Sequence, residues 1–252
     1  MRCIRMTLAY DGTQYHGWQE QPGQVTVQGT LVERLATILR ERPAVEGAGR
    51  TDSGVHALGQ VAAFQTEHRI ETARLRAAIN SRLPPDIVVT EMGEAPLGFR
   101  PSVDATSKIY RYRVYRSPLK PVFEARYVWH WYQRLEVEPM REAARHLVGR
   151  HDFRSFEGRG SQRDDTVREI LRLDMTEAGA EVHFEVEGNR FLYRMVRNIV
   201  GTLIEVGRGH RTPEWVAEVL AARDRTAAGP TAPPQGLCLM EVRYPDEKVR
   251  LG

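Results

Sequence analysis

The sequence predicts an α+β fold in two halves, each a β-sheet with helices on one face. Residues 2–10 alternate apolar and polar side chains, the period of a half-buried strand. Residues 27–38 carry apolar side chains at helical spacing, and Thr26 before them is a favoured N-cap residue. Strand-type and helix-type segments recur in the second part of the 252 residues. We therefore expect two halves, 1–105 and 106–252.

The remaining elements are expected from apolar spacing and from glycine and proline stops. In the first half, a glycine-rich turn at 47–54 precedes strand 60–66, and a helix with an apolar stripe at 75–83 precedes strand 87–92, after which strand 109–116 begins the second half. In the second half we expect helix 139–147, hairpin 167–187, helix 195–207, a helix capped by Thr212, a mobile loop at 226–236 and strand 237–244.

Composition indicates a globular protein with an arginine-rich surface. Hydrophobic residues make up 41% and charged residues 27% of the chain, which carries a formal net charge of +3. Lys108, Lys120 and Lys248 are its only lysines, so the cations are overwhelmingly arginine. Because arginine pairs with phosphates and stacks on bases, this usage favours a nucleic-acid partner. A codon bias toward arginine explains the composition alone equally well.

The chain lacks several sequence features, and their absence limits the compartment and the cofactors that we expect. Cys3 and Cys238 lie near opposite ends and form neither a disulfide framework nor a CxxC metal motif. No apolar run approaches the roughly 20 residues that a membrane helix needs. The first residues lead directly into an alternating strand, without the apolar core of a signal peptide. We expect a cytoplasmic protein that does not associate with membranes.

The segment at 48–56, AGRTDSGVH, is the strongest candidate for chemistry. Gly49 and Gly54 bracket Arg50 and Asp52, and glycines let the backbone turn tightly and approach a ligand closely. A cation two residues before an aspartate favours its ionised form. An ordinary turn explains the same residues, since Asp-Ser-Gly is a common turn tripeptide. The segment matches neither the P-loop nor the GxGxxG pattern.

A second segment interleaves tyrosine with arginine at 108–116, KIYRYRVYR. On a strand, Tyr110 and Tyr112 share one face, whereas Arg111 and Arg113 share the other. Such a surface suits stacking on bases and pairing with phosphates, although core tyrosines with solvated arginines explain it too. A third segment, 189–199, opens a helix with three arginines, one of which we expect to have an anionic partner.

Five ordered segments resemble the tRNA pseudouridine synthases of the TruA family. They are residues 49–56, residues 10–13 (YDGT) with 16–19 (HGWQ), residues 191–207 (FLYRMVRNIVGTLIEVG), residues 151–156 (HDFRSF) and residues 236–239 (GLCL). The resemblance covers nearly the whole chain in order. It implies a pseudouridine synthase fold of two α/β halves, with mainly antiparallel sheets flanked by helices and a central cleft.

The resemblance also implies the activity and its residues. The reaction is isomerisation of uridine to pseudouridine at positions 38, 39 and 40 of the tRNA anticodon stem-loop, by a homodimer without cofactor or metal. Asp52, in the first half, corresponds to the catalytic aspartate, with Arg50 beside it. In the second half, which completes the cleft, Tyr110 corresponds to the tyrosine that stacks on the target uracil. Arg197 corresponds to the arginine that pairs with the catalytic carboxylate.

Two positions depart from the family pattern. Ser53 stands where the family usually has alanine, a small change beside the catalytic aspartate. Residues 99–102, FRPS, replace the more frequent Phe-His-Ala-Arg, so the family's RNA contacts are not carried over to that segment. Three routes stay open for Asp52: attack on C1′, attack on C6, or removal of a ribose proton.

Two other function classes explain part of the sequence. A non-catalytic RNA-binding protein with RRM-like sheets explains the Tyr/Arg strand but gives Arg50 and Asp52 no role. A zinc-dependent base hydrolase needs HxE…CxxC or HExxH spacing, which the eight histidines do not show. The synthase therefore remains the favoured hypothesis.

Overall fold

The computed structural model describes residues 1–160 and 164–249, which form two compact units. Unit 1 is Met1–Thr106 with Cys238–Gly252, and unit 2 is Ser107–Leu237. The expected halves placed the last strand in the second half, whereas the structure places it in unit 1. The reason is a parallel pairing in which Cys238 lies opposite His56 and Leu239 lies opposite Ala57.

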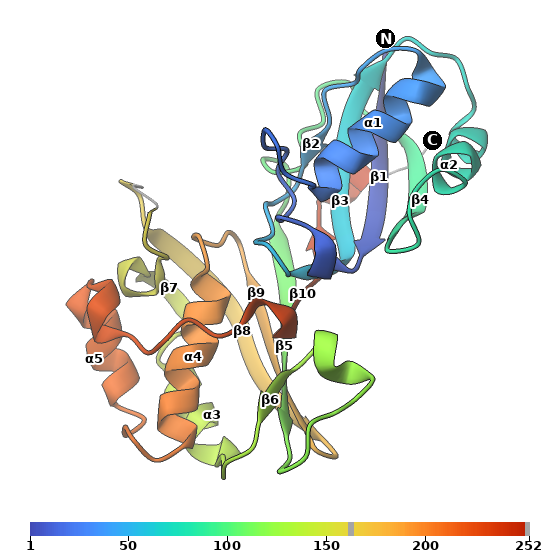
Figure 1. Cartoon of the computed structure of the whole chain (residues 1–252). Helices are drawn as coiled ribbons and strands as arrows, with labels where there is room; N and C mark the ends of the chain where they lie inside the picture. The colour runs from blue at the N-terminus through green and yellow to red at the C-terminus, as the bar shows by residue number, and fades with distance from the viewer. Residues whose placement is uncertain (161–163, 250–252) are drawn as a thin grey trace. The chain divides into compact units, whose positions relative to one another are not determined.

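Unit 1 is a sheet with its two longer helices on one face (Figure 1). Its strand order is β4-β1-β3-β10, and β2 pairs with β3. The strands are β1 (Arg2–Tyr10), β2 (Glu46–Gly47), β3 (His56–Thr66), β4 (Ile87–Ala95) and β10 (Leu237–Arg243). The helices are η1 (Gly12–Gln14), α1 (Val27–Leu39), α2 (Thr72–Asn80) and α6 (Asp246–Val249). Apart from the β3–β10 pair, the strands pair antiparallel.

Helix α1 begins where its cap residue predicts. The Thr26 hydroxyl accepts a hydrogen bond from the Gly29 backbone N–H at 3.2 Å, which satisfies a donor of the first turn. The helix ends at Leu39 because Arg40 adopts a left-handed conformation, with φ of 59°. The helix therefore ends four residues before Pro43.

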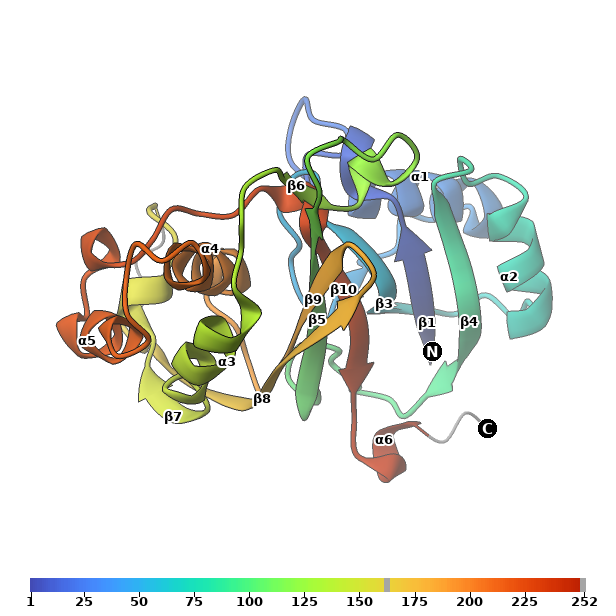
Figure 2. The ribbon, with the colours of Figure 1, turned by 90° about the horizontal axis from the view of Figure 1, so that it is seen from below.

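In unit 2 the sheet has strand order β5-β9-β8-β7 with antiparallel pairs, and β6 pairs in parallel with β5. Its three longer helices cover one face of this sheet (Figure 2). The strands are β5 (Ser107–Arg116), β6 (Trp129–Trp131), β7 (Gly149–Asp152), β8 (Val167–Ala178) and β9 (Glu181–Gly188). The helices are α3 (Val137–Arg145), α4 (Met195–Gly207), α5 (Trp215–Ala222), η2 (Glu124–Arg126), η3 (Arg154–Phe156), η4 (Arg225–Ala227) and η5 (Pro234–Gly236).

Helix α4 is the central helix of unit 2. Every residue of it except Glu205 is buried, because segment 228–232 packs against the side that the sheet leaves open. A Cβ atom on Gly201 would lie 1.7 Å from the Pro230 carbonyl oxygen, so only glycine allows this approach. The stretch expected to be a mobile loop is thus packed on α4.

The α+β class with mainly antiparallel sheets is confirmed in each unit. Within the described ranges, no helix has the length and apolar character needed to cross a bilayer.

Candidate active site

Asp52 lies in the turn that joins β2 to β3, and hydrogen bonds fix the backbone on both sides of it. The Thr51 hydroxyl lies 2.8 Å from the Tyr10 hydroxyl, and the Thr51 carbonyl accepts from the Trp18 backbone N–H at 3.0 Å. Before Asp52, the Gly49 carbonyl accepts from the Gln60 side-chain amide at 2.8 Å. The turn is therefore anchored to β1, to β3 and to the segment at 16–19.

Close backbone packing explains the glycines around this turn. Gly17 adopts φ of +89°, and a Cβ atom there would lie 2.6 Å from the Thr51 carbonyl oxygen. A Cβ atom on Gly12 would lie 2.0 Å from the Val55 carbonyl oxygen. Glycine at both positions lets the segments at 10–13 and 16–19 lie directly against the Asp52 turn.

The turn presents Asp52 in a half-buried position and Arg50 in an exposed one. Arg50 forms no ion pair with Asp52, nor with any other carboxylate among residues 1–160 and 164–249. The two residues are neighbours in the chain, but the arginine side chain extends into solvent. The structure does not bring the Arg50 guanidinium to the Asp52 carboxylate.

His56, at the start of β3, has a structural contact in unit 1. Its Nδ1 accepts a hydrogen bond from the Gly12 backbone N–H at 3.1 Å, and the same atom lies 3.1 Å from Asp11 Oδ1. These contacts tie η1 to the first residue after the Asp52 turn.

Strand β5 has the two faces that its alternation predicts. Tyr110 and Tyr112 are buried, and Arg111 and Arg113 are partly exposed. Tyr110 packs edge-on against Phe191, with ring centroids 5.1 Å apart at 82°. The Tyr112 hydroxyl donates to the Pro233 carbonyl oxygen at 2.8 Å. Both tyrosines are thus held by contacts with other segments of unit 2.

The strand arginines pair with carboxylates on the neighbouring strand β9. Arg111 bonds Glu185 at 2.8 Å. Arg113 bonds Glu181 through two nitrogens, each at 2.7 Å. These hydrogen bonds hold the pKa of each glutamate below its usual value, with Arg113 and Arg111 as the largest causes. Each of the two arginines therefore forms a cross-strand ion pair with a glutamate of the sheet.

Arg197 is buried on α4, with 8% of its surface exposed. Its Nε donates to the Ala232 carbonyl oxygen at 2.8 Å. Burial raises the pKa of Tyr112 and the positive charge of Arg197 opposes that rise, so the two side chains interact electrostatically. Asp52 and Arg50 belong to unit 1, whereas Tyr110 and Arg197 belong to unit 2, on elements β5 and α4 that contact each other.

The motif at 151–156 has an architectural role in unit 2. The Ser155 hydroxyl donates to the Val219 carbonyl at 2.6 Å and accepts from the Asp224 backbone N–H at 2.9 Å. The Asp152 carboxylate accepts from the Thr166 hydroxyl at 2.5 Å. These bonds join η3 to the end of α5, and the end of β7 to the residue before β8. Among the described residues, no group of three or more His, Cys, Asp or Glu side chains has the arrangement of a metal site.

Comparison with known protein families gives a match to a profile described as tRNA pseudouridine synthase, over residues 6–102 and 143–245. The chain belongs to the tRNA pseudouridine synthase family. The resemblance drawn from the five segments is thereby confirmed. The matched ranges contain Asp52 and Arg197, while Tyr110 lies between them, so its assignment depends on the Tyr/Arg motif.

Curated relatives in this family match over nearly their full length. A tRNA pseudouridine synthase A of Geotalea uraniireducens is 45% identical, covering 97% of this chain and 100% of the relative. Those of Geobacter sulfurreducens and Myxococcus xanthus are 44% and 46% identical, covering 97% and 98% of this chain and 100% and 93% of the relatives. A chain in the crystal structure of a Cbf5-Nop10-Gar1 complex gives a TM-score of 0.40 at 11% identity, covering 94% of this chain and 49% of that one, a likeness too weak to add to the assignment.

Proposed function

We propose that this protein isomerises uridine to pseudouridine in the anticodon stem-loop of tRNA, at positions 38, 39 and 40, with Asp52 as the catalytic group. Family membership supports the reaction. The observation that carries the residue assignment is the turn, which holds a half-buried carboxylate between Thr51 and Val55 by bonds to three other segments. A fixed backbone costs little reorganisation when the carboxylate meets its substrate.

The chemistry requires no redox partner. The bond from ribose C1′ to uracil N1 breaks, the base turns, and a bond from C1′ to C5 forms. The C5 proton is lost and N1 gains a proton, so substrate and product have the same composition. One ionised carboxylate serves each of the three routes open for Asp52.

The other site residues are proposed to act on the same uridine. A uridine in or beside a stem must leave the base stack, and an aromatic surface offsets the unstacking cost. Tyr110 is proposed to provide that surface. Arg197 is proposed to pair with the Asp52 carboxylate and keep it ionised. Arg50, exposed in the free protein, is proposed to lie beside the reacting nucleotide.

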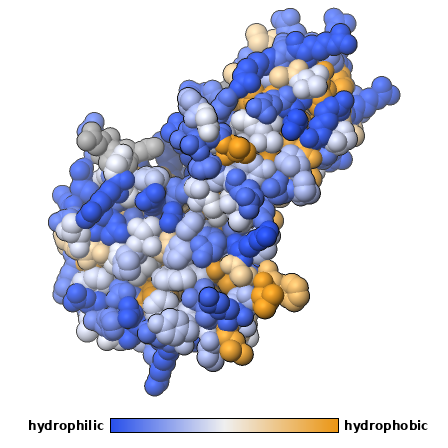
Figure 3. Space-filling model, viewed as in Figure 1, coloured by the Kyte–Doolittle hydropathy of each residue, from blue (hydrophilic) through white to orange (hydrophobic). Residues whose placement is uncertain are grey.

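We further propose that the enzyme acts as a homodimer in the cytoplasm. Between β5 and β6, Leu119, Val122 and Phe123 have 76, 83 and 88% of their surface exposed. Figure 3 shows apolar surface at the edge of unit 2 where this connection lies. Neighbouring apolar side chains at such exposure favour contact with another protein surface, and a second copy of this chain is the proposed partner. Sedimentation should give a dimer for the wild type and a smaller species for Phe123→Glu; a monomeric wild type would contradict the proposal.

The activity is tested with unmodified tRNA transcripts, without added cofactor and in the presence of EDTA. Carbodiimide mapping should find pseudouridine only at positions 38–40, with the wild type and not with Asp52→Asn. Tight tRNA binding without any pseudouridine would favour the RNA-binding alternative. Activity lost in EDTA and restored by zinc would contradict a metal-free reaction.

A further inference from the structure

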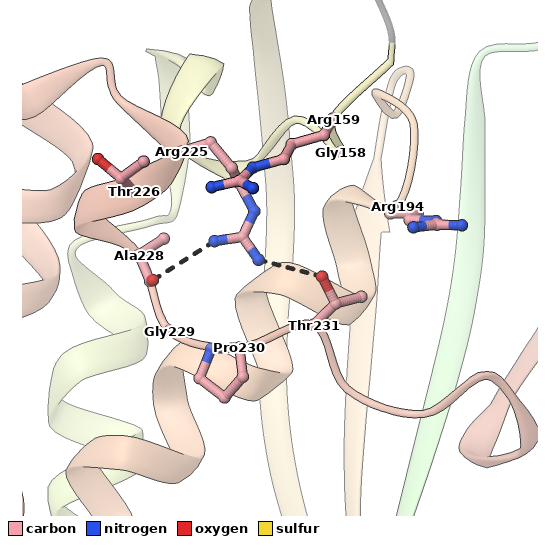
Figure 4. Close-up of a pocket in the computed structure, with 9 residues that line it drawn as sticks. All are labelled: Gly158, Arg159, Arg194, Arg225, Thr226, Ala228, Gly229, Pro230 and Thr231. Carbon is pink, nitrogen blue, oxygen red and sulfur yellow. Dashed lines mark hydrogen bonds between the residues drawn. The ribbon is translucent and has the colours of Figure 1, made fainter.

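Unit 2 contains an arginine-lined cavity of about 360 Å³ that none of the roles above uses (Figure 4). Its lining residues come from three segments: Gly158 and Arg159; Arg194; and Arg225, Thr226, Ala228, Gly229, Pro230 and Thr231. No carboxylate lines the cavity, and none in the described part of the chain forms an ion pair with Arg159, Arg194 or Arg225. The charge of Arg159 is among the causes that lower the pKa of Asp224, so one carboxylate lies near the cavity, but three arginines line it. The cavity therefore carries an excess of positive charge.

Hydrogen bonds fix the walls of the cavity. The Gly158 backbone N–H donates to the Tyr193 carbonyl at 2.7 Å, which joins the Arg159 segment to the Arg194 segment. The Arg225 guanidinium donates to Asn198 Oδ1 at 3.1 Å and to the Thr231 hydroxyl at 3.0 Å, and the latter bond is drawn in Figure 4. The cavity is thus preorganised by the same contacts that fold its walls.

The charges inside the cavity oppose one another. In Figure 4 the guanidinium groups of Arg159 and Arg225 both lie over the segment that ends at Thr231, whereas the side chain of Arg194, which also lines the cavity, extends away from them. The pKa of Arg225 is lowered, by burial first and by the charge of Arg159 second. Two cations held close in a partly desolvated place raise the free energy of the empty site, and a bound anion lowers it.

The residues that line the cavity indicate which kind of anion it would bind. It contains no aromatic side chain, so it offers no surface for stacking a base. Its size lies near the lower end of small-ligand sites. Planar guanidinium groups pair with phosphate oxygens through two parallel hydrogen bonds. These features suit a phosphate group without its base.

We propose that the cavity lined by Arg159, Arg194 and Arg225 is a phosphate subsite that holds a backbone phosphodiester of the bound tRNA. The proposal rests on the proposed action on tRNA. Its chemistry is shared with free phosphate, which the test below distinguishes.

The test measures tRNA affinity against salt for Arg159→Ala and for the double variant Arg159→Ala/Arg194→Asn. Both side chains are exposed, and asparagine tolerates the left-handed conformation of residue 194, where φ is 57°. Arg225 is left intact because it also holds the cavity wall. Arg150→Ala is the matched control, since Arg150 is an exposed arginine of unit 2 that forms no ion pair with any described residue.

Each subsite arginine removed should lower the slope of log affinity against log salt by about 0.7 to 0.9. The dissociation constant at about 0.15 M salt should rise several-fold to about tenfold per arginine. Single-turnover rates on saturating tRNA should stay within about twofold. Ethylation of one tRNA phosphate should weaken binding to the wild type and to Arg150→Ala, but no longer to Arg159→Ala.

Three results would contradict the proposed phosphate subsite. One is a double variant that behaves like Arg150→Ala in slope and affinity. Another is an unchanged ethylation pattern. The third is calorimetric binding of inorganic phosphate or pyrophosphate that Arg159→Ala abolishes while the tRNA slope stays the same, which would make the cavity a free-anion site. A wild type that makes no pseudouridine would instead contradict the proposed function.

Discussion

Arg197 donates a hydrogen bond through Nε to the Ala232 carbonyl oxygen at 2.8 Å, and the Ala232 backbone N–H donates to the Arg197 carbonyl oxygen at 3.1 Å. This reciprocal pair joins α4 to the segment before β10. It also uses one nitrogen of the guanidinium for positioning. The side chain proposed to meet the catalytic carboxylate is thus held from its inner end.

Arg197→Lys tests that arrangement. A lysine keeps the charge but has no Nε–H, so the bond to Ala232 is lost from a buried place. We expect the free energy of unfolding to fall by about 1.5–3 kcal/mol and the single-turnover rate to fall with it. Urea denaturation and single-turnover assays measure the two effects. Wild-type chemistry in this variant would show that the bond to Ala232 is not needed to position the cation.

Asp52→Asn keeps the size of the side chain and removes its charge. It should abolish pseudouridine formation while tRNA affinity stays within a few-fold, because the turn is held by backbone and Thr51 contacts that asparagine does not disturb. Residual activity above about a hundredth of the wild type corresponds to a loss of about 2.7 kcal/mol or less. Such a value would exclude Asp52 as the essential group.

Tyr110 is tested by a pair of substitutions. Tyr110→Phe keeps the ring and its contact with Phe191, whereas Tyr110→Ala loses both. If stacking alone matters, phenylalanine should retain the single-turnover rate and alanine should not. If the hydroxyl moves the C5 proton, both variants should be slow. Rates equal to the wild type in both would show that Tyr110 lies outside the site.

Sequence patterns predicted the elements whose structure depends on residues that are close in the chain. The Thr26 cap placed the start of α1, and alternation on β5 placed Tyr110 and Arg111 on opposite faces. Long-range pairing was not predictable from such patterns. The return of β10 to unit 1 depends on a parallel contact with β3, and no spacing rule identifies a parallel partner so far away in sequence.

The candidate site divides in the same way. The glycines at 49 and 54 indicated a tight turn at Asp52, but its anchor, the contact of Thr51 with Tyr10, joins residues far apart in sequence. The arginine-lined cavity gave no sequence signal, because Arg159 and Arg225 each look like an ordinary surface arginine. Ser155 is the opposite case, because its motif was recognisable in the sequence but its contacts were not. The motif indicated the family, whereas the Ser155 hydroxyl bonds the end of α5 and the residue Asp224 after it.

Arg113→Ala should affect stability more than chemistry, because the side chain is committed to Glu181. We expect the free energy of unfolding at pH 7 to fall by about 1–2 kcal/mol. The pKa of Glu181 is lowered in the folded protein, so its contribution is complete above the unfolded value of about 4.3 and is lost as pH falls through the folded value. The difference between wild type and variant should therefore shrink below about pH 4. Normal stability combined with failed chemistry would contradict the face assignment of β5.

Lys108, two residues before Tyr110 on β5, makes stability depend on alkaline pH. Burial, with a smaller contribution from Arg190, lowers its pKa to about 8. An unfolded lysine keeps its proton to about pH 10.4, so between these values the unfolded chain binds more protons and the free energy of unfolding rises with pH.

The rise should total about 2–3 kcal/mol, at about 1.4 kcal/mol per pH unit. Lys108→Met should abolish it, since methionine fills a similar volume without a titrating group. Lys120→Met is the matched control, because Lys120 is exposed and should leave the slope unchanged. Urea denaturation at pH 7.5 and at pH 10 measures the change in the free energy of unfolding for each protein. Comparison of each variant with the wild type then removes the contribution of every other group that titrates in this range. Equal slopes in the wild type and in Lys108→Met would mean that Lys108 keeps its charge when buried. A carboxylate partner such as Glu187, on the adjacent strand β9, would then be the group to replace.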